Sequence, residues 1–200
     1  GGTHLPDITV IVPVFYSEDG NEPDAFVAAR GHHSDVGGIA PGSMPPESRT
    51  IEEEGVLIDN ALLVDAGRFL ETEIRELLAS ARFPARNPDR NISDLRAQLA
   101  ACTRGMELLH GAARDQGADV VSAYMAHVLA NAEESVRGLL DRLSDGEFAY
   151  AMDNGAVVRA AIRIDHANRS AVFDFTGTSD QLPDNFNAPK SITRAAALYV

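Results

Sequence analysis

Cysteine, basic residues and long apolar runs are scarce in this chain of 200 residues. The single cysteine, Cys102, excludes an internal disulfide framework and a cysteine-based zinc cluster, so a metal site would have to use histidine, aspartate and glutamate. Only 17 lysines and arginines stand against 30 aspartates and glutamates, and the net charge of -13 opposes binding to nucleic acid or to an anionic membrane. Small molecules and other proteins remain as partners.

No apolar run reaches the roughly 18 to 20 residues of a membrane span, and the first residues form no signal segment. We therefore expect a cytoplasmic protein. The apolar fraction of 44% is enough to bury a core. The chain starts inside a motif-like segment and stops in the apolar run TRAAALYV without a helix stop signal, which predicts one partial domain over residues 1–200, truncated at both ends.

Short apolar runs, partly β-branched, predict β-hairpins near both ends of the chain. The runs Ile8–Phe15 and Ala25–His32, separated by the turn-rich segment YSEDGNEPD, predict the first hairpin. The runs VVRAAIRID and SAVFDFTG, on either side of HANR, predict the second. In the first hairpin, the residues before one strand and after the other share an end, so His4 and Asp7 are expected near the histidine pair His32-His33.

Helical spacing dominates the middle of the chain. One helix is predicted over about Ala66–Ala81, ending at FPARNP. Two longer apolar seams follow, with Cys102 as a small core residue on the first: Ile92, Leu95, Leu99, Cys102, Met106 and Leu109, then Val121, Met125, Val128, Ala132, Val136, Leu139 and Leu143. The short connector DQGAD predicts that these two helices are antiparallel. The sequence thus predicts an α+β piece in which β-hairpins flank a long antiparallel helical hairpin.

The pairs His4-x-x-Asp7 and His32-His33-x-Asp35 supply nitrogen and carboxylate donors of the kind that bind divalent Zn, Mn or Fe. The same spacing also fits a hydrogen-bonded turn, and spacing alone does not decide between the two. Adjacent residues on an extended chain point to opposite faces, so one histidine is expected as a ligand and the other as a supporting or substrate contact. Glycines around the pair leave room for a turn that would bring both in.

Two further segments carry candidate groups. The Glu52–Glu54 run follows a Gly/Pro-rich loop, GGIAPGSMPPES; it is either a solvated acidic stretch or the source of one general base or ligand, for which we choose Glu54. The loop after the second predicted hairpin is either a plain turn or a set of substrate contacts, with these candidates: Thr176, Gly177, Thr178, Ser179, Asn185 and Asn187. Neither segment has the lysine and helix of a nucleotide-binding P-loop.

Longer blocks carry a resemblance. In this order, GGTHLPDITVIVPVF, ARGHHSDVGGIAPGSMPPES, EEEGVLI, NISDLRAQLAA, VRGLLDRL, DFTGTS and NFNAP resemble successive signature blocks of the hydantoinase B/oxoprolinase family, from Gly1 to Val200. Members of that family are considerably longer, so the chain resembles an internal fragment of the B half. The residues of ARGHHSDVGGIAPGSMPPES and EEEGV look closer to those of 5-oxoprolinases than to those of the related carboxylases.

The resemblance implies ATP-dependent opening of a small cyclic amide, 5-oxoproline to glutamate or a hydantoin to a carbamoyl amino acid, in an oligomeric enzyme. It also implies that a partner A-type half binds the ATP, so this segment does not. A divalent metal (Mn, Zn or Fe) is implied at His4, Asp7 and His32. His33, Asp35 and Glu54 are then expected as catalytic groups.

Two other functions remain open at this stage. The amphipathic seams would also fit an assembly module that docks to the A half while the catalytic groups lie elsewhere. The clustered histidines and aspartates would fit a metal-dependent amidohydrolase that needs no ATP.

Overall fold

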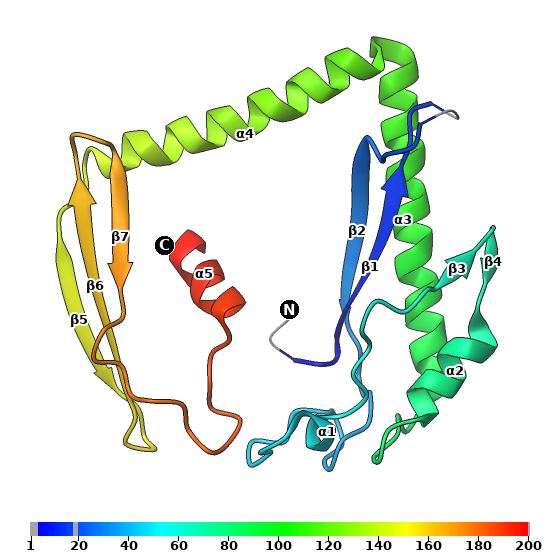
Figure 1. Ribbon diagram of the computed structural model, residues 1–200, viewed down its shortest axis with the longest axis horizontal. Helices are drawn as coiled ribbons and strands as arrows, with labels where there is room; N and C mark the ends of the chain where they lie inside the picture. Colours follow the sequence, from blue (N-terminus) through cyan, green and yellow to red (C-terminus); the bar gives the residue numbers. More distant parts are fainter. Residues whose placement is uncertain (1–3, 18–19, 200) are drawn as a thin grey trace. The chain divides into compact units, whose positions relative to one another are not determined.

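The structure is a computed structural model that describes residues 4–17 and 20–199 (Figure 1). Outside this range lie Gly1 to Thr3 of the first motif, Glu18 and Asp19 of the predicted turn, and Val200. The chain divides into two units, which we name the hairpin unit (Gly1–Gly111 with Leu182–Val200) and the sheet unit (Ala112–Gln181). That the two units belong to one domain stays a prediction.

The hairpin unit starts with the predicted antiparallel pair, β1 (Asp7–Val14) and β2 (Ala25–His32). Ile8, Val10 and Val14 are buried, and Val12 packs against the same core. Thr9, Ile11 and Pro13 point the other way, as strand alternation requires. Directly paired residues share a face. The outer face of the hairpin therefore consists of the four pairs Asp7–His32, Thr9–Arg30, Ile11–Ala28 and Pro13–Phe26.

After β2 the chain runs through an irregular loop and then forms the single-turn helix α1 (Ile51–Glu54). The N–H of Gly38 donates to the carbonyl of Phe83 at 3.0 Å, which ties the loop to the segment before α3. Beside it, Gly37 has φ 97°, and a Cβ atom there would lie 2.1 Å from the carbonyl oxygen of Phe83. Only glycine combines this φ with so close a backbone contact.

The helix predicted over Ala66–Ala81 begins later, as α2 (Glu71–Ala79). Ala66 and Gly67 have φ 46° and 81° and form a tight turn between two short strands, β3 (Val64–Asp65) and β4 (Arg68–Phe69). Positive φ at both central residues is the mark of a type I′ hairpin turn, which no helix can contain. The helix prediction is wrong at its start because turn geometry outweighs apolar spacing there.

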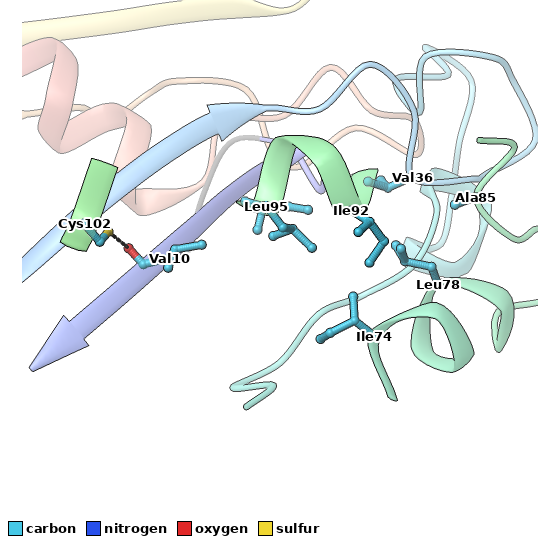
Figure 2. Close-up of a cluster of buried hydrophobic side chains, with 9 residues drawn as sticks. Val10, Val36, Ile74, Leu78, Ala85, Ile92, Leu95 and Cys102 are labelled. Carbon is cyan, nitrogen blue, oxygen red and sulfur yellow. Dashed lines mark hydrogen bonds between the residues drawn. The ribbon is translucent and has the colours of Figure 1, made fainter. Parts of the chain in front are cut away.

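The core of the hairpin unit forms where α3 (Pro88–Gln116) packs against the inner face of the hairpin and α2. Figure 2 shows Ile92 and Leu95 of α3 beside Ile74 and Leu78 of α2. The predicted core position of Cys102 is confirmed, since it is fully buried and its thiol donates to the Val10 carbonyl at 3.7 Å. Burial raises the pKa of this thiol, which disfavours the reactive thiolate.

The sheet unit contains α4 (Ala118–Leu140) and one antiparallel sheet of three strands, β5 (Gly146–Ala151), β6 (Val157–Asp165) and β7 (Ser170–Asp174). The second predicted hairpin is confirmed as β6 and β7. The strand β5 was not predicted from the sequence; its segment GEFAYA alternates aromatic with small residues and has no β-branched residue. Nor was α5 (Lys190–Tyr199) predicted, which belongs to the hairpin unit.

The predicted α+β class, with helices and small antiparallel sheets, is confirmed. Only Gly117 separates α3 from α4. Because α4 and most of α3 belong to different units, their antiparallel packing stays a prediction. Among residues 4–17 and 20–199, no helix combines the length and the apolar character that crossing a membrane requires.

Gly37 and Gly42 allow a matched test of the loop. Both have positive φ, 97° and 86°, but a Cβ atom at Gly42 would meet nothing within 4 Å. We expect Gly42→Ala to lower the free energy of unfolding by about 1 to 2 kcal/mol, the cost of a left-handed backbone. Gly37→Ala should cost roughly 3 kcal/mol or more, because the Phe83 carbonyl must also move.

Urea unfolding of the full-length protein, followed by circular dichroism, measures both losses. Equal losses in the two variants would show that the contact with the Phe83 carbonyl does not matter.

Candidate functional site

The HLPD segment and the end of β2 meet at one end of the hairpin. The carbonyl of Pro6 accepts the N–H groups of Ile8 and His33, both at 2.9 Å, so the turn before β1 is tied to the residue after β2. Asp7 is paired with His32 in the strand register. The expectation that these two motifs come together is met in the described chain.

Three of the candidate side chains lie close together there. His32 Nδ1 lies 2.8 Å from Asp7 Oδ1, and since a carboxylate can only accept, Nδ1 carries the hydrogen. The backbone N–H of His4 donates to Asp7 Oδ2 at 3.3 Å, and the rings of His4 and His32 meet edge to face with centroids 6.4 Å apart. These three residues form what we name the HD cluster: His4, Asp7 and His32.

Asp7 is held as an anion in this cluster. Partial burial raises the pKa of its carboxyl, but the hydrogen bonds from His32 and from the His4 backbone, with the charges of both histidines, outweigh burial and leave the pKa below its ordinary value. The side chain of Asp7 is 18% exposed and that of His32 is 47% exposed. The cluster is therefore a charged group at the surface, open to a ligand.

The donor types of the HD cluster, two imidazoles and one carboxylate, are those of a divalent transition-metal site. Within the described part of the chain, however, no three histidine, cysteine or acidic side chains are arranged to hold an ion together. One oxygen of Asp7 is taken up by His32. The residues fit a metal by chemistry and neighbourhood, and side-chain rotation would be needed to bind one.

His33 points away from this cluster and is 1% exposed. Its Nε2 lies 3.0 Å from Gln98 Oε1, and its Nδ1 lies 3.1 Å from Asn91 Nδ2. The amide of Gln98 is oriented independently, because its Nε2 donates to the carbonyls of Ile8 and Ala29, both at 2.9 Å. Only its oxygen is left for His33.

These contacts fix the proton of His33. Facing the Gln98 oxygen, Nε2 must carry the hydrogen, and Nδ1 then accepts from the Asn91 amide, whose other hydrogen goes to the Asp35 carbonyl at 2.9 Å. Both ring nitrogens of His33 are thus used inside the core. The two histidines face opposite sides, as expected for adjacent residues of a strand: His32 faces outward, and His33 is buried, while the ligand role of either one stays a prediction. A catalytic role for His33 stays a prediction, and it would require these bonds to open.

Asp35 organises the loop that follows. Its carboxylate accepts the N–H groups of Gly37 at 2.9 Å, Gly42 at 3.1 Å and Arg86 at 3.1 Å, and pairs with Arg86 Nη1 at 2.7 Å. The same guanidinium donates to the carbonyls of Gly37 and Gly38. Burial raises the pKa of Asp35, but these hydrogen bonds outweigh it and lower the pKa. The carboxylate is fully engaged in shaping the loop.

In the Glu52–Glu54 run, Glu53 and Glu54 form hydrogen bonds that stabilise the local structure. Glu53 Oε2 accepts the N–H groups of Arg49 at 2.7 Å and Thr50 at 3.4 Å, which caps the start of α1. Glu54 is half-buried, and its Oε1 accepts from the hydroxyl of Ser48 at 3.3 Å. No hydrogen bond or ion pair among the described residues links Glu54 to the HD cluster.

The predicted substrate contacts divide between the two units. In the sheet unit, Thr178 Oγ1 accepts from the N–H and donates to the carbonyl of Arg159, both at 3.0 Å. Ser179 exchanges hydrogen bonds with Val157 through its N–H and its hydroxyl, at 2.9 and 2.8 Å. Thr176 donates its N–H to Asp174, and Gly177 has φ 87°. This segment extends the β6–β7 pair, as a plain turn would.

The two asparagines belong to the hairpin unit. Asn185 donates from its side chain to the Pro45 carbonyl at 3.2 Å and from its backbone to that of Pro46 at 3.3 Å, so it anchors its loop on the GGIAPGSMPPES loop. Among the residues that the structure describes, the side chain of Asn187 bonds within its own loop, to Leu182 and Asp184. The six predicted substrate contacts are thus not brought together within either unit.

Sequence reasoning missed Gln98, Asn91 and Arg86. The first two had a detectable signal, because they stand among Ile92, Leu95 and Cys102 on the apolar seam of α3, where a polar residue must find buried partners. Arg86 follows the FPA segment of a loop, and nothing in its surroundings pointed to a partner 51 residues earlier.

Asp35→Asn tests the loop clamp, since it removes the charge and keeps the shape. At neutral pH we expect the free energy of unfolding to fall by about 2 kcal/mol, as for lost hydrogen bonds to a charged group. The folded-state pKa lies below the ordinary value of 3.8, so this stabilisation is complete above pH 3.8 and is lost as the pH falls through the folded-state pKa.

Urea unfolding of the full-length protein over a descending pH series measures this difference. Asp65→Asn is the control, because Asp65 is exposed and its carboxylate has no hydrogen bond among the described residues. A gap between wild type and Asp35→Asn that did not narrow in acid would refute the assignment.

Comparison with known proteins gives the chain its relatives. It is 41% identical over 211 residues to a 5-oxoprolinase of Dictyostelium discoideum and 41% identical over 223 residues to 5-oxoprolinase 1 of Arabidopsis thaliana, in both cases over 100% of this chain. The chain spans only 16% and 17% of the length of these relatives. It is an internal fragment relative to them, as its sequence predicts.

Among solved structures, the ATP-dependent caprolactamase from Pseudomonas jessenii is similar, with a TM-score of 0.72 and 27% identity. The similarity covers 92% of this chain and 31% of the caprolactamase chain. The family model described as hydantoinase B/oxoprolinase matches residues 1–200, the whole sequence. On this match, the chain belongs to the hydantoinase B/oxoprolinase family.

Proposed function

We propose that the chain is part of an ATP-dependent cyclic amide hydrolase that opens 5-oxoproline to glutamate, with a hydantoin as the alternative substrate. The observation that carries the proposal is the HD cluster, where the strand register sets Asp7 beside His32 and the turn adds His4. The names of the relatives, two 5-oxoprolinases and an ATP-dependent caprolactamase, support the reaction type.

The proposal assigns ATP binding to an A-type partner half, in a cytoplasmic oligomeric enzyme. This chain offers no P-loop motif, and its net charge of -13 is unfavourable for a triphosphate. Phosphorylation of the lactam oxygen by ATP would convert the inert amide into an imidate. Water then adds at that carbon, and the C–N bond breaks as the ring nitrogen takes a proton, which leaves an acyl phosphate. A second water cleaves the acyl phosphate to the carboxylate and inorganic phosphate.

The HD cluster is the proposed place of a divalent ion, Mn, Zn or Fe. Such an ion would polarise an oxygen of the substrate or lower the pKa of a bound water. Asp7 orients the ring of His32 through Nδ1, which leaves Nε2 as the nitrogen available for binding. Support comes from the donor chemistry and from the anionic state in which its neighbours hold Asp7.

Glu54 is the best candidate for the acid–base group among His33, Asp35 and Glu54. His33 uses both ring nitrogens in the core, and Asp35 uses both carboxylate oxygens in the loop clamp. The hydrogen bonds of the described residues engage only one oxygen of Glu54. The proposed substrate contacts at residues 176–179, 185 and 187 are the weakest part, because their polar groups already bond within the fold.

One observation favours the assembly module as a second candidate function. Within the described range α4 has no buried residue, and its apolar side chains line an exposed groove formed by Val120, Val121, Tyr124, Met125, Val128 and Leu129. Tyr124 is 68% exposed and Leu129 is 72% exposed, which is unusual for side chains on one helix face. Docking of another chain segment would cover them.

His4→Ala and Asp7→Ala in the full-length protein with its ATP-binding half test the proposed reaction. We expect each to lower ring opening by more than about 100-fold and to reduce bound metal, because the lost side chain acts at the activated substrate. ATP binding should stay unchanged. Measurements of glutamate release, nucleotide binding and metal content by elemental analysis separate these effects.

His166→Ala is the control, since His166 lies in the exposed turn between β6 and β7. Near wild-type turnover in the His4 and Asp7 variants would place the chemistry elsewhere and favour the assembly module. Loss of activity without loss of metal would leave the cluster catalytic but not metal-binding.

A further inference from the structure

The outer face of the hairpin continues beyond the HD cluster. The next outward pair along the strands is Thr9 and Arg30, directly after Asp7 and His32. Residues two apart on a strand are separated by about 7 Å, and they point to the same side. Arg30 therefore shares an open surface with the cluster, one step away from it.

Arg30 is oriented by a single contact. Its Nε donates to the hydroxyl of Thr9 across the strand pair at 2.9 Å. This bond fixes the plane of the guanidinium and leaves its two terminal nitrogens available. A guanidinium with one edge anchored in this way presents parallel N–H donors, the geometry that binds a carboxylate through two hydrogen bonds.

The fold does not use the charge of Arg30. The side chain is exposed, and no carboxylate within the described ranges forms an ion pair with it. By contrast, Arg86, Arg75 and Arg96 each pair with acidic side chains of the hairpin unit. An ordinary solvated surface arginine would also lack an ion pair. The position of Arg30 beside the HD cluster favours a binding role over that of a solvated side chain.

We propose that Arg30 binds the carboxylate of the cyclic amide substrate and thereby selects lactams that carry a carboxylate next to the ring nitrogen. This inference rests on the proposed function and deepens it. In 5-oxoproline the carboxylate and the scissile C–N bond are a few bonds apart, which suits a cation one strand step from the cluster. Caprolactam, by contrast, has no carboxylate for such a cation to bind.

A phosphate on the activated substrate could bind the same cation. The two sources differ in one respect: every phosphorylated lactam carries the phosphate, but only the acid carries the carboxylate. A comparison of 5-oxoproline with 2-pyrrolidinone, the same ring without the carboxylate, therefore distinguishes them.

The test uses the full-length protein with its ATP-binding half and the variant Arg30→Met, which keeps the length of the side chain. We expect KM for 5-oxoproline to rise by about 10- to 100-fold, the loss of one charged bidentate contact, with kcat little changed. Turnover of 2-pyrrolidinone should not change. Arg30→Lys should recover part of the loss, and Thr9→Val should show a smaller rise in KM, because it removes only the anchor.

Arg90→Met is the matched control, since Arg90 is also exposed, lies on α3 and has no ion pair in the described part of the chain. A second measurement needs no turnover. Calorimetric titration with 5-oxoproline and with its methyl ester should show that wild type prefers the acid and that Arg30→Met binds both alike.

The outcomes distinguish a wrong role for Arg30 from a wrong proposed function. Equal losses on 5-oxoproline and 2-pyrrolidinone, or an unchanged preference for the acid over the ester, would overturn the role of Arg30 while leaving the ring-opening function intact. A wild-type enzyme that neither binds nor opens 5-oxoproline would overturn the proposed function itself.

Discussion

One buried amide, that of Gln98, holds the site end of the hairpin in place. It donates to a carbonyl on each strand, those of Ile8 and Ala29, and accepts from His33 just beyond the second strand. A Cβ atom at Gly31 would lie 3.2 Å from the carbon of this amide, so a side chain at that position would press on Gln98. A single residue of α3 thus fixes both strands and the segment after them.

This bracing explains the different surroundings of two adjacent histidines. On the buried side of the hairpin end both ring nitrogens of His33 are hydrogen-bonded, so this ring has one defined tautomer and a fixed orientation. The opposite side has no such constraint, and His32 keeps a half-exposed ring with one nitrogen bound to Asp7. Because adjacent residues of a strand point to opposite sides, His33 stabilises the core while His32 faces solvent beside Asp7.

The sequence was sufficient for features that depend on local pattern. Short apolar runs predicted the strands β1 and β2, and the shared end of the hairpin predicted that Asp7 lies near His32, which the register confirms. Features that depend on distant partners were out of reach: the carboxylate of Asp35 is satisfied by Arg86, 51 residues later. Apolar spacing also gave a wrong helix start at Ala66 and Gly67, where positive φ forms a turn and the helix begins only at Glu71.

The hydrogen bonds within the fold also limit which polar groups can bind a substrate. Thr178, Ser179 and Asn187 have polar atoms, but these extend the β6–β7 pair beyond β7 or close a loop, and a ligand would have to displace those bonds. On the outer face of the hairpin, the groups need no such displacement. A chain with a net charge of -13 repels an anionic substrate in general, so a carboxylate can be held only where a cation stands without an acidic partner. Within the hairpin, Arg30 beside the HD cluster meets that condition, because its side-chain hydrogen bond among the described residues, to Thr9, neutralises none of its charge.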